Sequence, residues 1–565
     1  MSHPSLHIID LRILHTSDVH GHIFDGLSAI SSYVDRVRAQ MPGAVILTDG
    51  GDVLQGHPTA YYYNFIDTAS DHFIAEAMNH LRYDVGTIGN HDIETGHAVY
   101  DRWIRQCQFP VIGANVVEVS TGQPWLKPYV VLERQGIRIA FLGLLTAAIP
   151  YWLPENLWSG LRFEEMVASA RHWVQVIQEQ EHPDLLVGLF HSGWDDGFGI
   201  HTSDCVENAS RLVAAQVPGF DLILYGHDHQ RRVQRVTAAD GGSVLCCGPT
   251  STGGCLCDVS LRFHVRAGRV VRKDIDACLV PLRSPEVRTS ELTSLPPVTG
   301  FFPRQHAAVQ AFMNEEIGTF DCAVHESDAF FGPSAFIDLI HELQFQECPD
   351  AHISFVAPLS FDAVIGPGTV TMADMFALYK YENLLYTMRL TGREVLGHLE
   401  MSYDLWCNTM HTPEDHIMLL SNNLDSNRRL GLKNMAFNFD SAAGIRYTVD
   451  VTKPDGRKVH IESMADGSPF SLDSTYLVAL NSYRGNGGGE LLTRGAGIPL
   501  SELPGRIVSS TDHDLRYHLM QLIRQHGHVN PRPLNLWRFV PDEWALPALQ
   551  RDRLLLFPDT HTSAM

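Results

Sequence analysis

The sequence predicts an α/β first half joined to a separate α+β second half. In the first half, short apolar runs alternate with helical stretches, a pattern typical of a sheet covered by helices on both faces. From about residue 320 to 540, helices and strands follow a different, mixed order. Residues 283–303, between the halves, are rich in Pro, Ser and Thr and give the clearest boundary signal in the chain.

The apolar runs of the first half predict its strands, with helical patterns between them. Strands are expected at Leu11–Ser17, Ala44–Thr48, Val85–Ile88, Val111–Ala114, Leu185–Phe190 and Leu222–Tyr225, and helices at Leu27–Ala39, Phe73–His80 and Phe163–Glu179. Residues 129–146 read as a hairpin inserted into this order, and residues 231–282 as antiparallel strands. The second half is expected to hold helices near 333–346 and 392–402 and strands near 352–356 and 476–481.

A length of 565 residues is enough for two to four domains. We expect a first domain over residues 5–284, a linker with a helix over 285–321, a second domain over 322–540 and a tail over 541–565. The tail has no clear pattern after residue 545.

Composition and net charge restrict the classes of partner that we expect this chain to bind. The chain is 44% hydrophobic with a formal net charge of −23, which suits a globular protein but not a general binder of nucleic-acid backbones. No apolar run is long enough to span a membrane, since Ile139–Leu153 is short and contains Pro150. Asp10 and Arg12 interrupt any apolar signal region at the beginning, so we expect a cytoplasmic protein, or a periplasmic one if a signal was trimmed.

Four of the ten cysteines cluster, and a zinc site is one interpretation of them. Cys246 and Cys247 are adjacent, and Cys255 and Cys257 are one residue apart. These spacings lack the two-to-four-residue gap of zinc knuckles, which favours free thiols in two β-strands.

Five short motifs rich in His, Asp and Asn follow apolar strands in the first half. In open α/β sheets, functional sites form at the carboxyl ends of the strands, so we expect these motifs to converge. Each motif alone is most often a turn or a solvated histidine, whereas five in order are not explained by chance. Their candidate ligands are Asp18, His20, Asp52, Asn90, His191, His227 and His229.

Carboxylate, imidazole and amide oxygen are hard-to-borderline metal ligands. Asp18 and His20, if extended, share one face of their segment, and His227 and His229 do the same. Seven groups are too many for one divalent ion and suit two, with a carboxylate as a possible bridge. A pair of ions roughly 3.5–4 Å apart suits hydrolysis at a phosphoryl centre.

In these motifs the sequence resembles the calcineurin-like metallophosphoesterases, and more closely the two-domain 5′-nucleotidase and 2′,3′-cyclic-nucleotide phosphodiesterase family, over nearly the whole chain. The resemblance implies a four-layer α/β/β/α metallophosphoesterase domain followed by an α+β 5′-nucleotidase C-terminal domain. It also implies two divalent ions, which Mn, Zn, Co or Fe could provide. Asp18, His20 and His229 would hold the first ion, Asn90, His191 and His227 the second, and Asp52 would bridge them.

His91 is then not a ligand, and the resemblance implies that it faces the substrate and, with Asn90, supports the phosphoryl or leaving oxygens. Family members usually carry Asp three positions later, where this chain has Glu94; Asp92 is the other candidate partner. His22, Gln55 and His57 are interpreted as outer-shell or surface groups, and His15 as a core histidine.

The second half resembles the family's nucleoside-binding domain, in which two aromatic rings hold the base. Segments 379–383 and 481–489 correspond to the two clamp segments, and Tyr381 and Tyr483 to the clamp residues. The resemblance extends the substrate contacts to Arg484, Asn486, Gly487 and Gly488. Glycines here would let the backbone approach the base or ribose.

Segment 356–361 discriminates between branches of the family. Ala357 and Pro358 occupy a stretch that is Gly-rich in typical 5′-nucleotidases, and Phe361 takes the place of their Arg. With Tyr at both clamp positions, this resembles the 2′,3′-cyclic-nucleotide 2′-phosphodiesterase/3′-nucleotidase branch, although residues 89–94 differ from the commoner form there.

The function expected is hydrolysis of a small nucleotide phosphoester. The alternatives are a 5′-nucleotidase, with nucleotide sugars as further substrates, and a non-catalytic nucleotide-binding protein. Nucleic acid and membrane are not expected partners, and no residue pattern indicates an oligomeric state.

Overall fold

The computed structural model describes residues 5–195, 199–202, 205–282, 298–361, 363–421 and 431–558. It divides into two compact units, residues 1–311 and 312–565. Most of the Pro-rich boundary segment, residues 283–297, lies outside the described residues. Among the described residues, no helix has the length and apolarity needed to cross a lipid bilayer.

Two six-stranded sheets form the centre of the first unit. The first sheet has the order β14-β13-β1-β2-β3-β4, with β1–β4 parallel and β13 antiparallel to β1. Its strands are β1 (Leu6–Thr16), β2 (Val45–Asp49), β3 (Val85–Thr87), β4 (Val111–Ile112), β13 (Cys255–Arg266) and β14 (Arg269–Pro281).

The second sheet has the order β11-β12-β10-β9-β7-β6, with its four central strands parallel. Its strands are β6 (Tyr129–Arg134), β7 (Ile137–Leu145), β9 (Leu185–His191), β10 (Leu222–Tyr225), β11 (Arg232–Thr237) and β12 (Ser243–Gly248). The predicted hairpin at 129–146 exists as β6 and β7, but β7 is a central strand paired in parallel with β9. Residues 129–146 are therefore part of the sheet and not an insertion into it.

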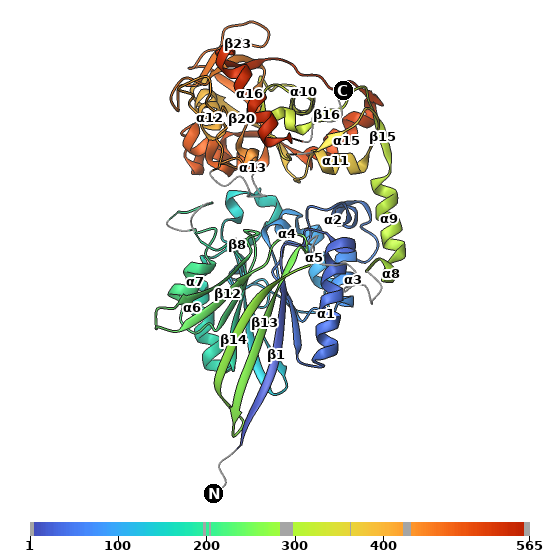
Figure 1. Cartoon of the computed structure of the whole chain (residues 1–565), viewed down its shortest axis with the longest axis vertical. Helices are drawn as coiled ribbons and strands as arrows, with labels where there is room; N and C mark the ends of the chain where they lie inside the picture. Colours follow the sequence, from blue (N-terminus) through green and yellow to red (C-terminus); the bar gives the residue numbers. More distant parts are fainter. Residues whose placement is uncertain are drawn as a thin grey trace. The chain divides into compact units, whose positions relative to one another are not determined.

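Apolar side chains from both sheets meet in one buried layer. Ile13 and Ile46 come from the first sheet, and Phe141, Val187 and Leu224 from the second. Helices cover the two outer faces, which completes the four layers expected (Figure 1). On one side lie α1 (Ser28–Gln40), α3 (Phe73–His80) and α5 (His97–Gln106), and on the other α6 (Met166–Gln180) and α7 (Ser210–Gln216).

The clustered cysteines are strand residues of this core. Cys246 and Cys247 are buried in β12, and Cys255 and Cys257 in β13. Cys247 and Cys257 lie in the layer between the sheets, whereas Cys246 faces α6 and α7. All four lie in strands, as predicted, and none of them forms a disulfide.

The second unit is built on a five-stranded sheet of order β21-β17-β24-β20-β25. Its strands are β17 (Ile353–Val356), β20 (Leu384–Thr391), β21 (Ser441–Ala443), β24 (Thr475–Asn481) and β25 (Ile507–Asp514). Smaller sheets are formed by β15 (Glu316–Phe320), β19 (Gly368–Thr371) and β26 (His528–Val529), by β22 (Ile445–Asp450), β23 (Val459–Met464) and β27 (Trp537–Val540), and by β16 (Val324–His325) and β18 (Val364–Ile365).

Side-chain caps start the predicted helices of this unit. Ser334 accepts a hydrogen bond from the backbone of Ile337 at the start of α10 (Ala335–Glu347), and Thr391 forms a capping box with Glu394 at the start of α12 (Gly392–Trp406). The other helices include α11 (Met372–Leu378), α13 (Ser482–Gly485), α14 (Leu503–Arg506) and α15 (Leu515–His526). The predicted tail contains α16 (Asp542–Leu556), which the sequence did not reveal because Leu546, Leu554 and Leu555 are exposed and blur its apolar face.

Candidate metal centre

The five motifs converge at the carboxyl ends of parallel strands in the first unit. Asp18 and His20 follow β1, and Asp52 follows β2. Asn90 begins α4 (Asn90–Glu94) after β3, His191 is the last residue of β9, and His227 and His229 follow β10. Strands of both sheets therefore deliver the candidate ligands to one region of the unit.

The ligands separate into two groups, each able to hold an ion. The first group contains Asp18, His20 and His229. Nε2 of His20 lies 3.1 Å from Nε2 of His229, which in turn lies 3.2 Å from Oδ1 of Asp18. The second group contains Asp52, His191 and His227.

Asn90 lies between the two histidines of the second group. Its Oδ1 is 3.0 Å from Nε2 of His191 and 2.8 Å from Nδ1 of His227. Nε2 of His191 is also 3.1 Å from Oδ2 of Asp52. The structure thus brings all seven predicted ligands into two neighbouring groups, with Asp52 and Asn90 both in the second.

The backbone at these residues differs from the extended form assumed from the sequence. Asp18, His20, Asp52, His227 and His229 all have positive φ, between 50° and 84°. Left-handed residues cost roughly 1–3 kcal/mol each and persist only where the surroundings hold them. This conformation also sends His227 and His229 to different groups, whereas an extended segment would have placed them on one face.

Two glycines have no room for a side chain beside these ligands. A Cβ on Gly226 would lie 2.5 Å from Oδ2 of Asp18, and one on Gly89 would lie 2.1 Å from Oδ1 of Asp52. Both glycines therefore allow the backbone of one motif to pass directly against a ligand of another.

The donor chemistry fits bound cations. Nδ1 of His191 lies 2.6 Å from the carbonyl oxygen of Gly50, an arrangement that leaves Nε2 to face the site. Oδ2 of Asp52 is buried and lies 3.1 Å from Nε2 of His191, without a hydrogen bond of normal geometry among the described residues. Burial raises the pKa of Asp52, but the charges of His191 and His91 outweigh this effect and hold it well below its usual range. An anionic, incompletely paired carboxylate among imidazoles is the setting of a metal ligand.

His91 lies beside the first group without joining it. Its ring meets the His20 ring edge-on at 5.5 Å between centroids, and its side chain is 28% exposed. Of the two candidate partners of His91, Glu94 is the one in contact with it: Oε2 of Glu94 lies 2.5 Å from Nδ1 of His91. Asp92 instead is fully buried and accepts backbone N–H groups at 2.8–2.9 Å. Those N–H groups belong to Asp52, Val53, Leu54 and Gly89.

Sequence reasoning missed two neighbours of His227. Oε1 of Glu207 lies 3.0 Å from Nε2 of His227, and the Trp152 ring stacks on the His227 ring at 5.7 Å. Neither residue ends a strand, so no pattern in the sequence singled them out. A carboxylate on the far nitrogen of a metal-binding imidazole fixes its tautomer and orientation.

In the second unit, the candidate clamp residues come from the same end of two neighbouring strands. Tyr381 precedes β20 and Tyr483 follows β24, and these strands pair antiparallel with Leu385 opposite Asn481. Both tyrosines are half-buried. Tyr483 meets Phe437 edge-on at 6.0 Å between centroids.

Arg484 and the glycines after it have different surroundings from those expected. Arg484 is 1% exposed, and its guanidinium donates to Asp440 and to the carbonyl oxygens of Phe437 and Gly488. These internal partners hold the guanidinium inside the unit, and the expected substrate contact of Arg484 stays a prediction. Gly488 and Gly487 are buried and Asn486 is half-buried, and a Cβ on Gly488 would lie 2.5 Å from the Tyr483 ring.

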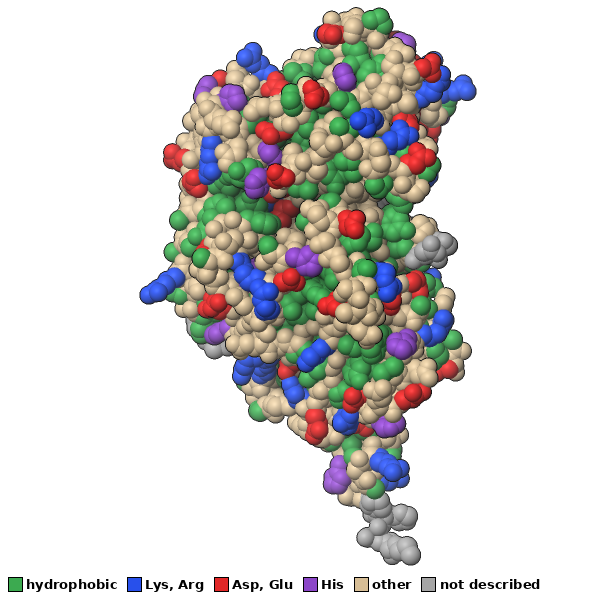
Figure 2. All heavy atoms as spheres, turned by 180° about the vertical axis from the view of Figure 1, so that it is seen from behind, with side chains coloured by type: hydrophobic (Ala, Val, Ile, Leu, Met, Phe, Trp, Pro, Cys, Tyr) green, Lys and Arg blue, Asp and Glu red, His purple; other side chains and the backbone are tan. Residues whose placement is uncertain are grey.

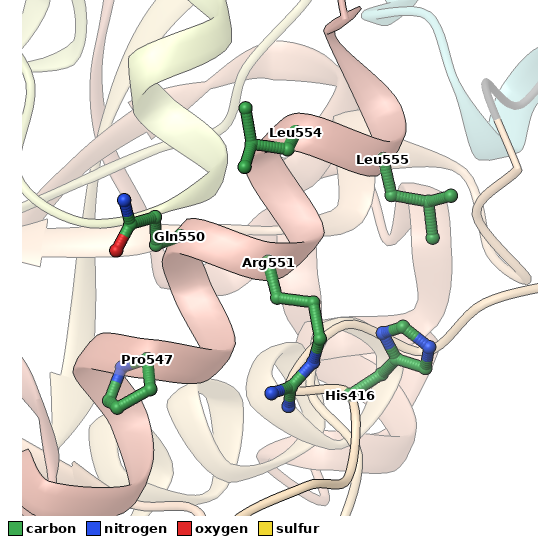
Figure 3. A pocket seen from close by; sticks show the side chains of 6 residues that line it. All are labelled: His416, Pro547, Gln550, Arg551, Leu554 and Leu555. Carbon is green, nitrogen blue, oxygen red and sulfur yellow. The ribbon is translucent and has the colours of Figure 1, made fainter.

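Two further features of the second unit are Phe361 and a hollow along α16. Phe361 stacks on Phe330 at 5.5 Å and packs against the core. A shallow hollow of about 540 Å³ lies along α16, where Arg551 and His416 lie side by side (Figure 3). It contains none of the predicted site residues. On the face shown in Figure 2, Lys and Arg lie scattered among Asp and Glu.

A paired-sheet fold with two groups of candidate metal ligands at its strand ends is the arrangement expected of a metallophosphoesterase. The sequence model of the calcineurin-like phosphoesterases matches residues 11–231, and that of the 5′-nucleotidase C-terminal domain matches residues 316–494. The chain belongs to the calcineurin-like phosphoesterases that carry a 5′-nucleotidase C-terminal domain. Members of this family hydrolyse phosphoric esters and depend on metal ions.

Two curated relatives match along most of this chain. The trifunctional nucleotide phosphoesterase YfkN of Bacillus subtilis is 26% identical over 95% of this chain, which spans 39% of YfkN. A 2′,3′-cyclic-nucleotide 2′-phosphodiesterase/3′-nucleotidase of Haemophilus influenzae is 25% identical over 94% of this chain and 88% of its own length.

Solved structures share the fold. A putative 5′-nucleotidase from Staphylococcus aureus superposes with a TM-score of 0.76 at 20% identity, covering 94% of this chain and 100% of its own. A 5′-nucleotidase precursor from Thermus thermophilus gives a TM-score of 0.63, also at 20% identity, covering 94% and 99%.

Proposed function

We propose that this chain is a dinuclear-metal hydrolase of nucleotide phosphoesters, most specifically a 2′,3′-cyclic-nucleotide 2′-phosphodiesterase/3′-nucleotidase. The observation that carries the proposal is the pair of adjacent ligand groups, three residues each, with buried Asp52 and Asn90 at the second. Residues 5–284 would form the catalytic domain, 285–321 a linker, and 322–540 the domain that selects the nucleotide.

Asp18, His20 and His229 would hold one divalent ion, and Asn90, His191 and His227 the other. Asp52 is the candidate bridge, because its Oδ2 faces His191 and because the neighbouring charges hold its pKa low in spite of burial. Two such ions, when bound, supply Lewis acidity toward phosphoryl oxygens and lower the pKa of water. The ligand set accommodates Mn, Zn, Co or Fe.

His91 would act on the substrate from beside this centre. Glu94 accepts a hydrogen bond from Nδ1, which leaves Nε2 available for a phosphoryl or leaving oxygen. The backbone N–H of His91 donates to Oδ1 of Asp52 at 2.8 Å, so the same residue also orients the candidate bridge. These two contacts fix the position of His91 from both sides.

The regiochemistry rests on relatives and on the clamp region. Proteins named 2′,3′-cyclic-nucleotide 2′-phosphodiesterase/3′-nucleotidase match 94% of this chain at 24–25% identity. Ala357, Pro358, Tyr381 and Tyr483 resemble that branch. Tyr381 and Tyr483 are our candidates for holding the base, because aromatic faces stack on any nucleobase.

The test is product analysis with three substrates. The manganese-loaded protein is incubated separately with 2′,3′-cyclic AMP, 3′-AMP and 5′-AMP, and the products are separated by chromatography. Opening of the cyclic ester to 3′-AMP, with adenosine released from 3′-AMP, is expected. Adenosine from 5′-AMP alone would refute the regiochemistry in favour of a 5′-nucleotidase. Bound metal without turnover of any of the three would refute hydrolysis of these nucleotides and favour a non-catalytic binding protein.

A further inference from the structure

A third group of metal-binding side chains lies outside the two groups assigned above. It consists of His22, Asp25 and His57. His22 immediately precedes a short helical turn at Ile23–Leu27 that contains Asp25, and His57 immediately precedes α2 (Pro58–Tyr61). The reaction proposed above uses none of these three residues.

The three side chains already approach the spacing of ligands on one ion. Nδ1 of His22 lies 3.0 Å from Oδ2 of Asp25, and the His22 and His57 rings are 4.6 Å apart between centroids. One ligand atom from each of the three lies within 4.8 Å of the others. Zinc holds imidazole and carboxylate at about 2.0–2.2 Å in a tetrahedron, so its ligand atoms are about 3.3 Å apart. Small side-chain rotations would therefore close this group around an ion.

Thr59 orients the second imidazole. Nδ1 of His57 lies 2.9 Å from Oγ1 of Thr59. Nδ1 also accepts the backbone N–H of Thr59 at 3.2 Å, as the cap of α2. An ion on Nε2 therefore requires the other tautomer of His57, in which Nδ1 donates to the Thr59 hydroxyl and gives up this cap.

The backbones that carry the three residues are held against each other. The backbone N–H of His57 donates to the carbonyl oxygen of His20 at 2.9 Å. Gly21 has a φ of +69°, and a Cβ on it would lie 2.7 Å from Cβ of Ala60. The two segments touch without room for a methyl group, so His22 and His57 cannot move apart without breaking this packing.

We propose that His22, Asp25 and His57 form a third metal site, which takes a borderline divalent ion such as Zn²⁺. Two imidazoles and one carboxylate match zinc's ligand preference and leave a fourth position for water. The His22 and Asp25 side chains are 26% and 50% exposed, which gives the ion a path from solvent. The same two segments carry His20 and Asp52, so this ion ties together backbone that also supports the catalytic groups.

The experiment measures zinc bound per chain by equilibrium dialysis of the full-length protein in a micromolar free-zinc buffer. The variant His22→Gln, Asp25→Asn is compared with the unchanged protein, and thermal melts check that both are folded. A loss of about one ion per chain is expected, with nucleotide hydrolysis changed by less than about threefold. His22→Gln alone should weaken the same ion, and it leaves the Thr59 contact of His57 intact.

The matched control is His264→Gln, Asp274→Asn. His264 and Asp274 form an equivalent pair at 2.9 Å but belong to no group of three ligands among the described residues. Equal zinc content in the His22/Asp25 variant and the unchanged protein would overturn the proposal, and so would an equal loss in the control. The experiment compares the zinc content of the variant with that of the unchanged protein. This difference tests the third site whether or not the two catalytic ions bind as proposed.

Discussion

The division of labour between Glu94 and Asp92 gives the sharpest test of the candidate site. Both carboxylates follow His91 within three residues, but Glu94 contacts the imidazole and Asp92 contacts only backbone N–H groups in the described residues. Removing one charge at a time, with the shape of the side chain preserved, should therefore produce two different defects. The variants are Glu94→Gln and Asp92→Asn.

Glu94→Gln should lower kcat and leave metal content and stability almost unchanged. A hydrogen bond to a charged group contributes about 1.5–3 kcal/mol and a neutral one about 0.5–1.5 kcal/mol. Glutamine keeps the hydrogen bond to His91 and loses the charge, so the loss is about 1–1.5 kcal/mol. In a transition state that His91 stabilises, this corresponds to about tenfold in kcat. For comparison, His91→Ala should lower kcat by about two to three orders of magnitude.

Asp92→Asn should damage folding first. The carboxylate accepts four backbone N–H groups, and an asparagine can present an oxygen to only half of them while its NH₂ group faces the rest. Two lost charge-assisted hydrogen bonds correspond to about 3–6 kcal/mol in the free energy of unfolding.

The assay combines steady-state kinetics at saturating manganese, metal analysis and urea unfolding for each variant. Loss of metal from Glu94→Gln would refute its role as the partner of His91. A large fall in kcat for Asp92→Asn with unchanged stability would reverse the assignment of the two residues.

Three further variants test other parts of the molecule. Asp52→Asn should reduce bound manganese and leave only background activity, because one charge between two cation sites is removed; full activity measured with 3′-AMP would contradict the dinuclear proposal. Glu207→Gln should weaken metal binding about 10–100-fold in a chelator competition while kcat at saturating metal is preserved, since it acts through His227. Tyr483→Ala should raise KM for nucleotides by the equivalent of about 1–3 kcal/mol and spare bis(p-nitrophenyl) phosphate; equal damage to both substrates would contradict the clamp. A pH prediction concerns Glu326, because burial raises its pKa to about 7 from the ordinary 4.5. The folded state then binds the proton more tightly than the unfolded state, so the free energy of unfolding should fall by about 3 kcal/mol between pH 4.5 and 7, relative to Glu326→Gln. Parallel pH profiles of the two proteins in urea unfolding would show that Glu326 does not titrate in this range.

The fold of the first unit could be predicted because its strands are buried on both faces. Such strands appear as continuous apolar runs, and α3 was located to the residue from its pattern, Phe73–His80. The place of β7 in the sheet was harder to predict. Its antiparallel hairpin with β6 can be recognised in the sequence, whereas its parallel pairing with β9 cannot. Pairing between distant segments leaves no trace in local periodicity, so 129–146 read as an insertion.

The candidate metal ligands could be predicted from residue type and strand order. The residues that contact those ligands from outside the site could not. His191 is recognisable as a histidine at the end of a strand, whereas Glu207 is an ordinary acidic residue in a connecting segment. Arg484 has a partner of the same kind: Asp440, 44 residues away, pairs with it inside the unit, and nothing in the local sequence indicates this contact. Contacts of this kind are set by tertiary packing and have no local signature.

The positive φ angles at the metal ligands explain why the site depends on the whole domain. A residue in the left-handed region costs about 1–3 kcal/mol, and single motifs supply no compensation of their own. The compensation comes from other motifs. The backbone N–H of Asp18 donates to the carbonyl oxygen of Gly51 at 2.9 Å, and the backbone N–H of His20 donates to the carbonyl oxygen of Asp52, also at 2.9 Å. The backbone N–H of His227 in turn lies 3.1 Å from the Asp18 carboxylate. Asp18, His20 and His227 are thus each held by a segment that carries another ligand, so the ligands of the two groups are positioned jointly and a change at one should be felt at the other.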